Sequence, residues 1–281
     1  MVNATTQREI RTLLHPTLSR RFRTNNRQLC FRRLPINCLT DTLLSETASR
    51  RNNMHAQIPQ IFATADGWCR AYPMKHKAEA HEGISLLFQR DGVPDLMIMD
   101  GALEQVKGTV RKKSREAGVH VKQTEPHSPL SNATEAAIRE LKKGVGQQTR
   151  SGAPKRLWDN CLECEVYNRS MTSHDIYKLN GQVPETVVNG ETADISPFAL
   201  FAWCEWVMFR DTSVSYPDNP MILGRNLGPA IDIGPAMTHT ILKSNGKVVY
   251  RSTVCSLTPD KLADEAMKLK QKEYTEKVNS D

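Results

Sequence analysis

Residues 94–100 read PDLMIMD, and residues 127–143 read HSPLSNATEAAIRELKK. In the first stretch an apolar run ends on Asp100, which is typical of a buried strand with a carboxylate at its carboxyl end. In the second, a loop rich in Pro, Ser and Asn leads into a helical pattern with Glu135 in the first turn or just beyond. The two carboxylates lie 35 residues apart (135 − 100).

A third carboxylate, Asp41, lies in the segment LPINCLTDTLL (34–44), whose apolar pattern predicts a strand. A charge in such a strand is costly unless it is paired or bound to a metal. Asp66 is the alternative, but it stands beside Gly67 at an expected hairpin turn, where Asp is favoured for turn geometry alone. It also precedes Asp100 by only 34 residues (100 − 66), which leaves little room for a strand and a helix. We therefore prefer Asp41.

The order of elements predicts an α/β fold with a mixed sheet over residues 31–190. The expected order along the chain is strand (34–44), hairpin (60–74), helix (75–92), strand (94–100), helix (101–118), strand (119–126), a loop that leads into a helix (127–148) and a further helix (153–172). From 198 to 258 the chain changes to short strands, including a type I′ hairpin signal at Asn245-Gly246, and these predict a small all-β, barrel-like domain. Residues 259–281 predict a charged helix that extends into solvent.

The N-terminal segment, residues 1–30, is predicted to be a basic and largely irregular arm. The chain has a net charge of +7, and residues 1–35 alone hold eight Arg against one acid, Glu9, so the remainder is close to neutral. A basic N-terminal segment on a protein that is otherwise close to neutral favours attraction to a polyanion such as nucleic acid. The same composition, with Ser and Thr, also fits a mitochondrial transit peptide, which stays an alternative.

The seven cysteines form no framework of the secreted type, and no stretch of about 18 apolar residues is present, so we expect an intracellular, reduced protein without a membrane partner. Cys161 and Cys164 form a CxxC pair inside a helical pattern. Without a second Cys or His pair at zinc-finger spacing, this pattern favours packing on a helix face over a metal site.

Three carboxylates that converge at one site are typical of an enzyme that catalyses metal-dependent phosphoryl transfer. Two divalent cations roughly 3.5–4 Å apart activate the attacking oxygen and stabilise the leaving oxygen of a phosphodiester. Magnesium prefers hard oxygen ligands and keeps some of its waters, so Asp41, Asp100 and Glu135 are enough to hold a pair. Each carboxylate taken alone is more often surface charge, and a Glu early in a helix also favours the helix dipole.

With these residues in place, the chain resembles the integrase core of retroelement polyproteins of the retroviral and copia type. The matching text is CLTDTL around Asp41, IMDGALEQ around Asp100 and EPHSPLSNATEAAIRELKKG around Glu135. The segment GQVPETVVNGETADISPFALFAW (181–203) resembles the passage by which copia-type elements leave that core and enter a small β-barrel. The likeness covers roughly residues 30–258.

The resemblance implies an RNase H-like five-stranded sheet and a DDE-type polynucleotidyl transferase. Such an enzyme trims a DNA 3′ end with water and then joins the 3′-hydroxyl to target DNA, using two Mg²⁺ or Mn²⁺ ions. Asp41, Asp100 and Glu135 would be the ligands. It further implies a homo-oligomer on DNA, action in the nucleus, and an origin as a fragment or decayed copy of a retrotransposon polyprotein.

The residues expected to contact DNA lie around Glu135. Arg139, Lys142 and Lys143 follow it by four, seven and eight residues and so share its helix face, where they are suited to phosphates. His127 and Asn132 belong to the preceding loop and match the family's DNA-contacting loop, although relatives often have an aromatic at the position of His127. An ordinary solvated helix face is the alternative for the three basic residues.

Two other functions stay open. One is a catalytically silent nucleic-acid-binding remnant that keeps the fold and the basic arm. The other is a hydrolytic nuclease of the same fold, for which a further carboxylate is expected; Glu104, four residues after Asp100, is a candidate, although integrases also have such a residue.

Overall fold

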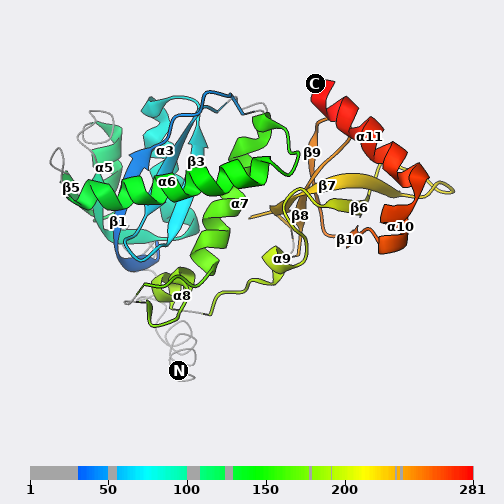
Figure 1. The fold of residues 1–281 in the computed structure, drawn as a ribbon. Coiled ribbons are helices and arrows are strands. Elements are labelled where there is room, and N and C mark those ends of the chain that lie inside the picture. Colours follow the sequence, from blue (N-terminus) through cyan, green and yellow to red (C-terminus); the bar gives the residue numbers. More distant parts are fainter. Residues whose placement is uncertain are drawn as a thin grey trace, which may run out of the picture.

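The computed structural model describes residues 31–49, 56–99, 108–123, 129–176, 179–190, 192–231, 233–234 and 237–280, and their side chains except those of residues 129–134 and 280. Asp100, His127 and the arm 1–30 therefore lie outside the described residues. The chain forms a larger sheet with helices on both faces and a smaller antiparallel sheet beside it (Figure 1).

The first sheet is mixed and has the strand order β3-β2-β1-β4-β5. β1, β2 and β3 form an antiparallel meander, while β4 lies parallel to β1 and β5 lies parallel to β4. The bounds are β1 Arg33–Thr42, β2 Ile58–Ala63, β3 Cys69–Met74, β4 Val93–Met99 and β5 His120–Gln123. The predicted α/β class with a mixed five-stranded sheet is confirmed.

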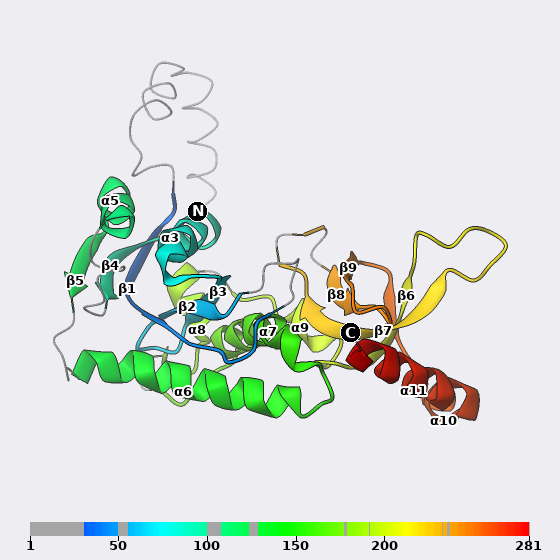
Figure 2. The ribbon, with the colours of Figure 1, turned by 90° about the horizontal axis from the view of Figure 1, so that it is seen from above.

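Helices cover both faces of this sheet because neighbouring strand residues point to opposite sides. Phe62 packs with Leu87 and Met97 under α3 and α5, whereas its neighbour Ile61 packs with Leu141 under α6 and α7 (Figure 2). The helices on the two faces are α3 Ala80–Arg90, α5 Thr109–Glu116, α6 Pro129–Thr149 and α7 Trp158–Met171. Short turns of helix, η3 Lys77–Glu79 and η4 Lys155–Leu157, precede α3 and α7, and α8 Pro184–Asn189 follows α7.

Helix α6 begins earlier than the sequence indicated. The predicted loop from Pro129 to Asn132 forms the first turn of the helix, so Glu135 lies in the second turn. Proline is tolerated at a helix start because the first N–H groups have no partner within the helix. Of the helix predicted over 101–118, the structure describes α5, and residues 101–107 lie outside the described part.

Both predicted hairpins are present. Gly67 has a φ of +92° in the turn that joins β2 to β3, a conformation that favours glycine. At the Asn245-Gly246 hairpin only Gly246 has a positive φ, of +73°, and its N–H donates to the carbonyl of Lys243. A type I′ turn needs positive φ at both central residues, so the predicted turn type is wrong.

The second sheet is antiparallel and has the strand order β10-β6-β7-β8-β9. Its strands are β6 Trp206–Arg210, β7 Met221–Pro229, β8 His239–Leu242, β9 Val248–Arg251 and β10 Val254–Ser256. They fall within the range predicted to be all-β, and the single-turn helix α9 Ser196–Ala199 precedes them. The strand pairings described leave β9 and β10 as the two edges of this sheet, so the predicted barrel-like closure is not confirmed.

The C-terminal segment packs on the second sheet, and its prediction as a solvated extension is wrong. It forms two helices, α10 Pro259–Ala263 and α11 Glu265–Ser280. Tyr274 and Val278 are buried against Leu227 and Leu242, and the Tyr274 hydroxyl donates to the carbonyl of Leu242 at 2.6 Å. These two residues are four apart and therefore share one helix face.

Candidate metal centre at the carboxyl ends of β1 and β4

Asp41 lies at the carboxyl end of β1 on the face of the sheet that α6 covers. It pairs across the antiparallel ladder with Ile61, which is fully buried in the cluster under α6 and α7. Directly paired strand residues project from the same face. The Asp41 side chain is half-buried, and its Oδ1 accepts a hydrogen bond from the Thr42 N–H at 2.7 Å.

The strand β4 ends at the same edge of the sheet as β1. Asp100 lies outside the described residues, but Met99, directly before it, pairs in parallel with Thr40, directly before Asp41. Parallel strands end at the same edge of a sheet, and a trans peptide separates successive Cα atoms by 3.80 Å. The two aspartates therefore follow a matched pair of residues at one sheet edge.

Glu135 is exposed on α6, one turn before the part of that helix that packs on the end of β1. Ile138, three residues after Glu135, lines a cavity together with Leu43, which lies two residues beyond Asp41. Residues three apart on a helix are neighbours, as are residues two apart on one face of a strand. Asp41 and Glu135 thus border the same contact between β1 and α6.

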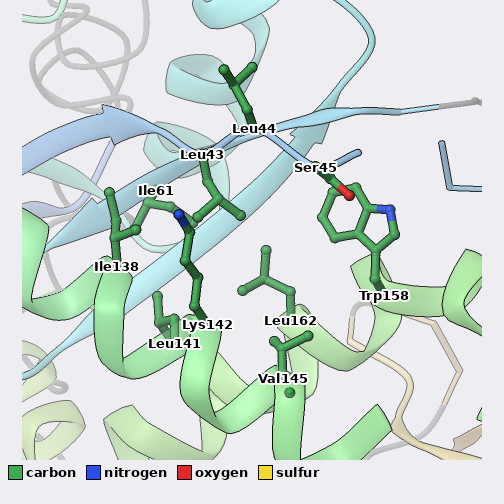
Figure 3. A pocket seen from close by; sticks show the side chains of 11 residues that line it. Leu43, Leu44, Ser45, Ile61, Ile138, Leu141, Lys142, Val145, Trp158 and Leu162 are labelled. Atoms are coloured by element: carbon green, nitrogen blue, oxygen red, sulfur yellow. The ribbon is translucent and has the colours of Figure 1, made fainter. Parts of the chain in front are cut away.

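The cavity at this contact measures about 220 Å³ and is mostly apolar. Figure 3 shows Lys142 of α6 extending toward Leu43, with its amine near the chain that leaves β1. Trp158 closes another side and donates its indole N–H to the carbonyl of Thr47 at 2.7 Å. The Lys142 stem covers apolar surface while its charge stays exposed, as expected of a long basic side chain.

The alternative carboxylate Asp66 lies elsewhere. It stands in the turn between β2 and β3, and because Ala63 at the end of β2 pairs with Leu39, this turn lies toward the amino-terminal half of β1. Its Oδ1 is buried without a hydrogen-bond partner among the described residues. This position separates Asp66 from the carboxyl edge where Asp41 lies. Glu104 falls outside the described residues.

The predicted DNA-contacting residues differ in their surroundings. Arg139 and Lys142 are exposed, and Lys143 is exposed and pairs with Glu140 at 3.6 Å, so part of its charge is compensated within the helix. Asn132 lies in the first turn of α6, in the part where side chains are not described, and His127 lies outside the described residues.

Among the described residues, Asp41 and Glu135 are suited to bind a hard divalent cation. Both have carboxylate oxygens, and both lie on the side of the sheet that α6 covers. Within the described residues, no group of three or more His, Cys, Asp or Glu side chains gathers at metal-binding distance. The third predicted ligand, Asp100, is not among those residues.

A buried ion cluster around Arg70 was missed by the sequence reasoning. Arg70 on β3 donates Nε to Asp91 Oδ1 at 2.8 Å and Nη2 to Glu185 Oε1 at 2.8 Å. Its guanidinium lies 4.7 Å from the Trp68 ring centroid and 4.3 Å from that of Tyr167. The nitrogen atoms Nε, Nη1 and Nη2 of Arg70 all donate hydrogen bonds within this part of the protein, so the cluster joins β3, the end of α3, α7 and α8.

The CxxC pair packs as predicted. Cys161 and Cys164 are both buried on α7. Burial raises the pKa of the Cys164 thiol to about 12 and raises the pKa of Cys161 above its ordinary value. Both side chains are therefore protonated at neutral pH, and a protonated thiol is a poor metal ligand.

Thiol reactivity gives a direct check on this packing. Of the described cysteines, only Cys255 is exposed, whereas Cys38, Cys69, Cys161, Cys164 and Cys204 are buried. In a Cys30→Ser variant at pH 8, we expect Ellman's reagent to titrate one thiol rapidly and the buried thiols only after denaturation. A second rapidly reacting thiol in the folded variant would contradict the packing of α7 and the sheets.

No helix among the described residues is long and apolar enough to cross a bilayer. No family model matches the chain, and no curated protein matches it in sequence. In structure, the chain is similar to the catalytic core domain of BIV integrase, with 14% sequence identity and a TM-score of 0.44, and the match covers 55% of this chain and 93% of that chain. A likeness of this size carries no argument about activity.

Proposed function

We propose that this protein is a retroelement-type integrase that processes DNA 3′ ends and joins them to target DNA. The observation that carries the proposal is the parallel pairing of Thr40 with Met99, because Asp41 and Asp100 directly follow these two residues in the chain. Side chains alternate along strands, so a continuation of β4 by one residue would present Asp100 on the same face as Asp41. That face is the one covered by α6, which bears Glu135.

In this proposal Asp41, Asp100 and Glu135 hold two Mg²⁺ or Mn²⁺ ions. When bound, the pair of ions neutralises charge at the attacking and leaving oxygens of the phosphodiester. The protein's own contribution is to position the carboxylates at a rigid sheet edge. Glu135 is exposed at the near end of α6, which leaves this side open to DNA.

Arg139 and Lys142 are proposed to hold DNA phosphates beside the ions. Both are exposed on α6 within two turns of Glu135, and Lys142 extends toward the end of β1 (Figure 3). Lys143 is assigned a weaker contribution because Glu140 already pairs with it. His127 and Asn132 complete the proposed DNA contacts on the strength of the sequence resemblance.

The proposed partners are element ends and target DNA, bound by a homo-oligomer, and the proposed place of action is the nucleus. These follow from the integrase resemblance and the basic composition of residues 1–35. A catalytically silent DNA-binding remnant of the same fold is the second candidate, since it would use the same basic residues without the ions.

A strand-transfer assay separates the candidates. The purified full chain is incubated with a labelled element-end duplex, a target plasmid and either Mg²⁺ or Mn²⁺. An integrase yields joined products, and a nuclease yields cleavage without joining. Salt-sensitive binding with neither product would overturn the enzyme proposal and support the silent remnant.

A further inference from the structure

Helix α5 presents three basic side chains on one exposed stripe. Val110 and Ser114 are buried against the body of the protein. At 100° per residue, Lys112 and Arg115 fall on the opposite side of the helix and Arg111 on its flank, and all three are exposed. None of them forms an ion pair within the part of the chain that the structure describes.

The adjacent edge strand β5 adds positive charge at the same edge of the sheet. Its Val121 packs against the cluster under α3 and α5, so the exposed His120 and Lys122 project from the opposite face of the sheet. Residues 109–123 contain five basic residues and one acid, Glu116, for a net charge of +4. Since residues 36–281 as a whole are neutral, the rest of that region has a net charge of −4. The positive charge is thus concentrated at one end of the sheet.

The Arg-rich N-terminal segment joins the fold at the same place. Arg33, at the start of β1, donates its guanidinium Nη1 to the carbonyl of Ala117 at 3.1 Å, at the carboxyl end of α5. Phe31 packs on Phe88 of α3 and lines a hollow together with Lys113 of α5. Residues 1–30, with six Arg and one Glu, directly precede Phe31 in the chain.

We propose that Arg111, Lys112 and Arg115, here named the α5 face, form a second DNA-binding surface that holds duplex phosphates without reading sequence. Guanidinium groups match phosphate oxygens in a bidentate fork, and four helical residues place Arg111 and Arg115 about 6 Å apart along the axis, close to two steps of 3.4 Å along a DNA strand. An acidic protein partner would need apolar anchors, and this stripe has none.

This surface is distinct from the DNA contacts proposed at α6. α5 and α6 lie on opposite faces of the sheet (Figure 2), so the α5 face would hold a different stretch of DNA from the one at the metal centre. The inference rests on the proposed function in taking DNA as the partner. Phosphate binding there requires no metal, which allows it to be tested separately.

The test measures how DNA affinity depends on salt. A fluorescent duplex of unrelated sequence is titrated with the full chain in EDTA, by anisotropy, between about 50 and 200 mM KCl. Each phosphate contact contributes about 0.9 to the slope of log affinity against log salt. The triple variant Arg111→Ala, Lys112→Ala, Arg115→Ala is therefore expected to lower this slope by about 2 to 3.

The matched control removes the same charge from α11 through Lys268→Ala, Lys270→Ala and Lys272→Ala, all exposed. An unchanged slope in the α5 variant, or an equal decrease in the α11 control, would overturn the proposal. The proposal would also be overturned if the α5 variant lost binding to polyglutamate but kept its binding to DNA, since this result would indicate a site for an acidic peptide. If the protein yields joined products in the strand-transfer assay but the α5 variant has an unchanged salt slope, only this inference is overturned. If the α5 variant has a lowered slope but the protein yields no joined product, only the enzyme proposal is overturned.

Discussion

Asp100→Asn is expected to lower strand transfer by about 10³-fold, because removing a ligand charge from a two-metal centre costs several kcal/mol of transition-state stabilisation. The amide keeps the size of the side chain but is a weaker ligand for a hard cation. Asp41→Asn is expected to give a loss of the same order. Joined product is quantified with wild type and variants at equal concentration, in Mg²⁺ and in Mn²⁺.

Two nearby aspartates supply the controls for this result. Asp95 lies on the same strand β4, with its side chain 58% exposed and paired with Arg33 at 3.0 Å, so Asp95→Asn should leave joining within a few-fold of wild type. Asp66→Asn tests the rejected alternative and should likewise retain activity. If Asp66→Asn lost as much activity as Asp41→Asn, or if Asp100→Asn kept a tenth of the wild-type rate, the proposed triad would be wrong.

Arg70→Met is expected to destabilise the protein by about 3–5 kcal/mol, since it leaves uncompensated buried charge. The side chains of Arg70, Asp91 and Glu185 are 3%, 8% and 10% exposed, so water replaces little of the lost ion pairing. Urea denaturation followed by circular dichroism measures the loss of stability as a shift in midpoint at an unchanged slope.

The control for this loss of stability is an ion pair that is exposed to solvent on the protein surface. Lys143 and Glu140 pair at 3.6 Å with side chains 68% and 44% exposed, so Lys143→Met should cost below about 1 kcal/mol. A second variant, with Asp91→Asn and Glu185→Gln added to Arg70→Met, should recover part of the stability if buried charge is the cause. A loss for Arg70→Met no larger than that for Lys143→Met would contradict the role assigned to the cluster.

Much of the first sheet could be predicted because its signals are local. The run ending at Met99 reads as a strand, and the helical spacing of Ala80, Ile84 and Leu87 predicts α3. The carboxylate pair at a spacing of 35 residues and the strand around Asp41 also needed no tertiary information. In each case the side that must be buried is encoded in the period of the apolar residues.

The start of α6 and the fate of the C-terminal helix were not predicted correctly. Pro129 and the polar residues after it read as a loop, because each of them is common in turns and only their place at a helix start makes them helical. In α11 the many charges suggested a solvated helix, although Tyr274 and Val278 stand four residues apart and reveal one buried face.

What the chain specifies locally is therefore its elements, their order and the end of β1 at which Asp41 lies. Which groups meet across the fold depends on packing between distant segments. Arg70 finds Asp91 at a separation of 21 residues and Glu185 at 115, and Arg33 meets Ala117 at 84. Periodicity shows that a face must be covered but contains no information about what covers it. The ion cluster, the packing of α11 and the α5 face therefore depend on how the segments assemble.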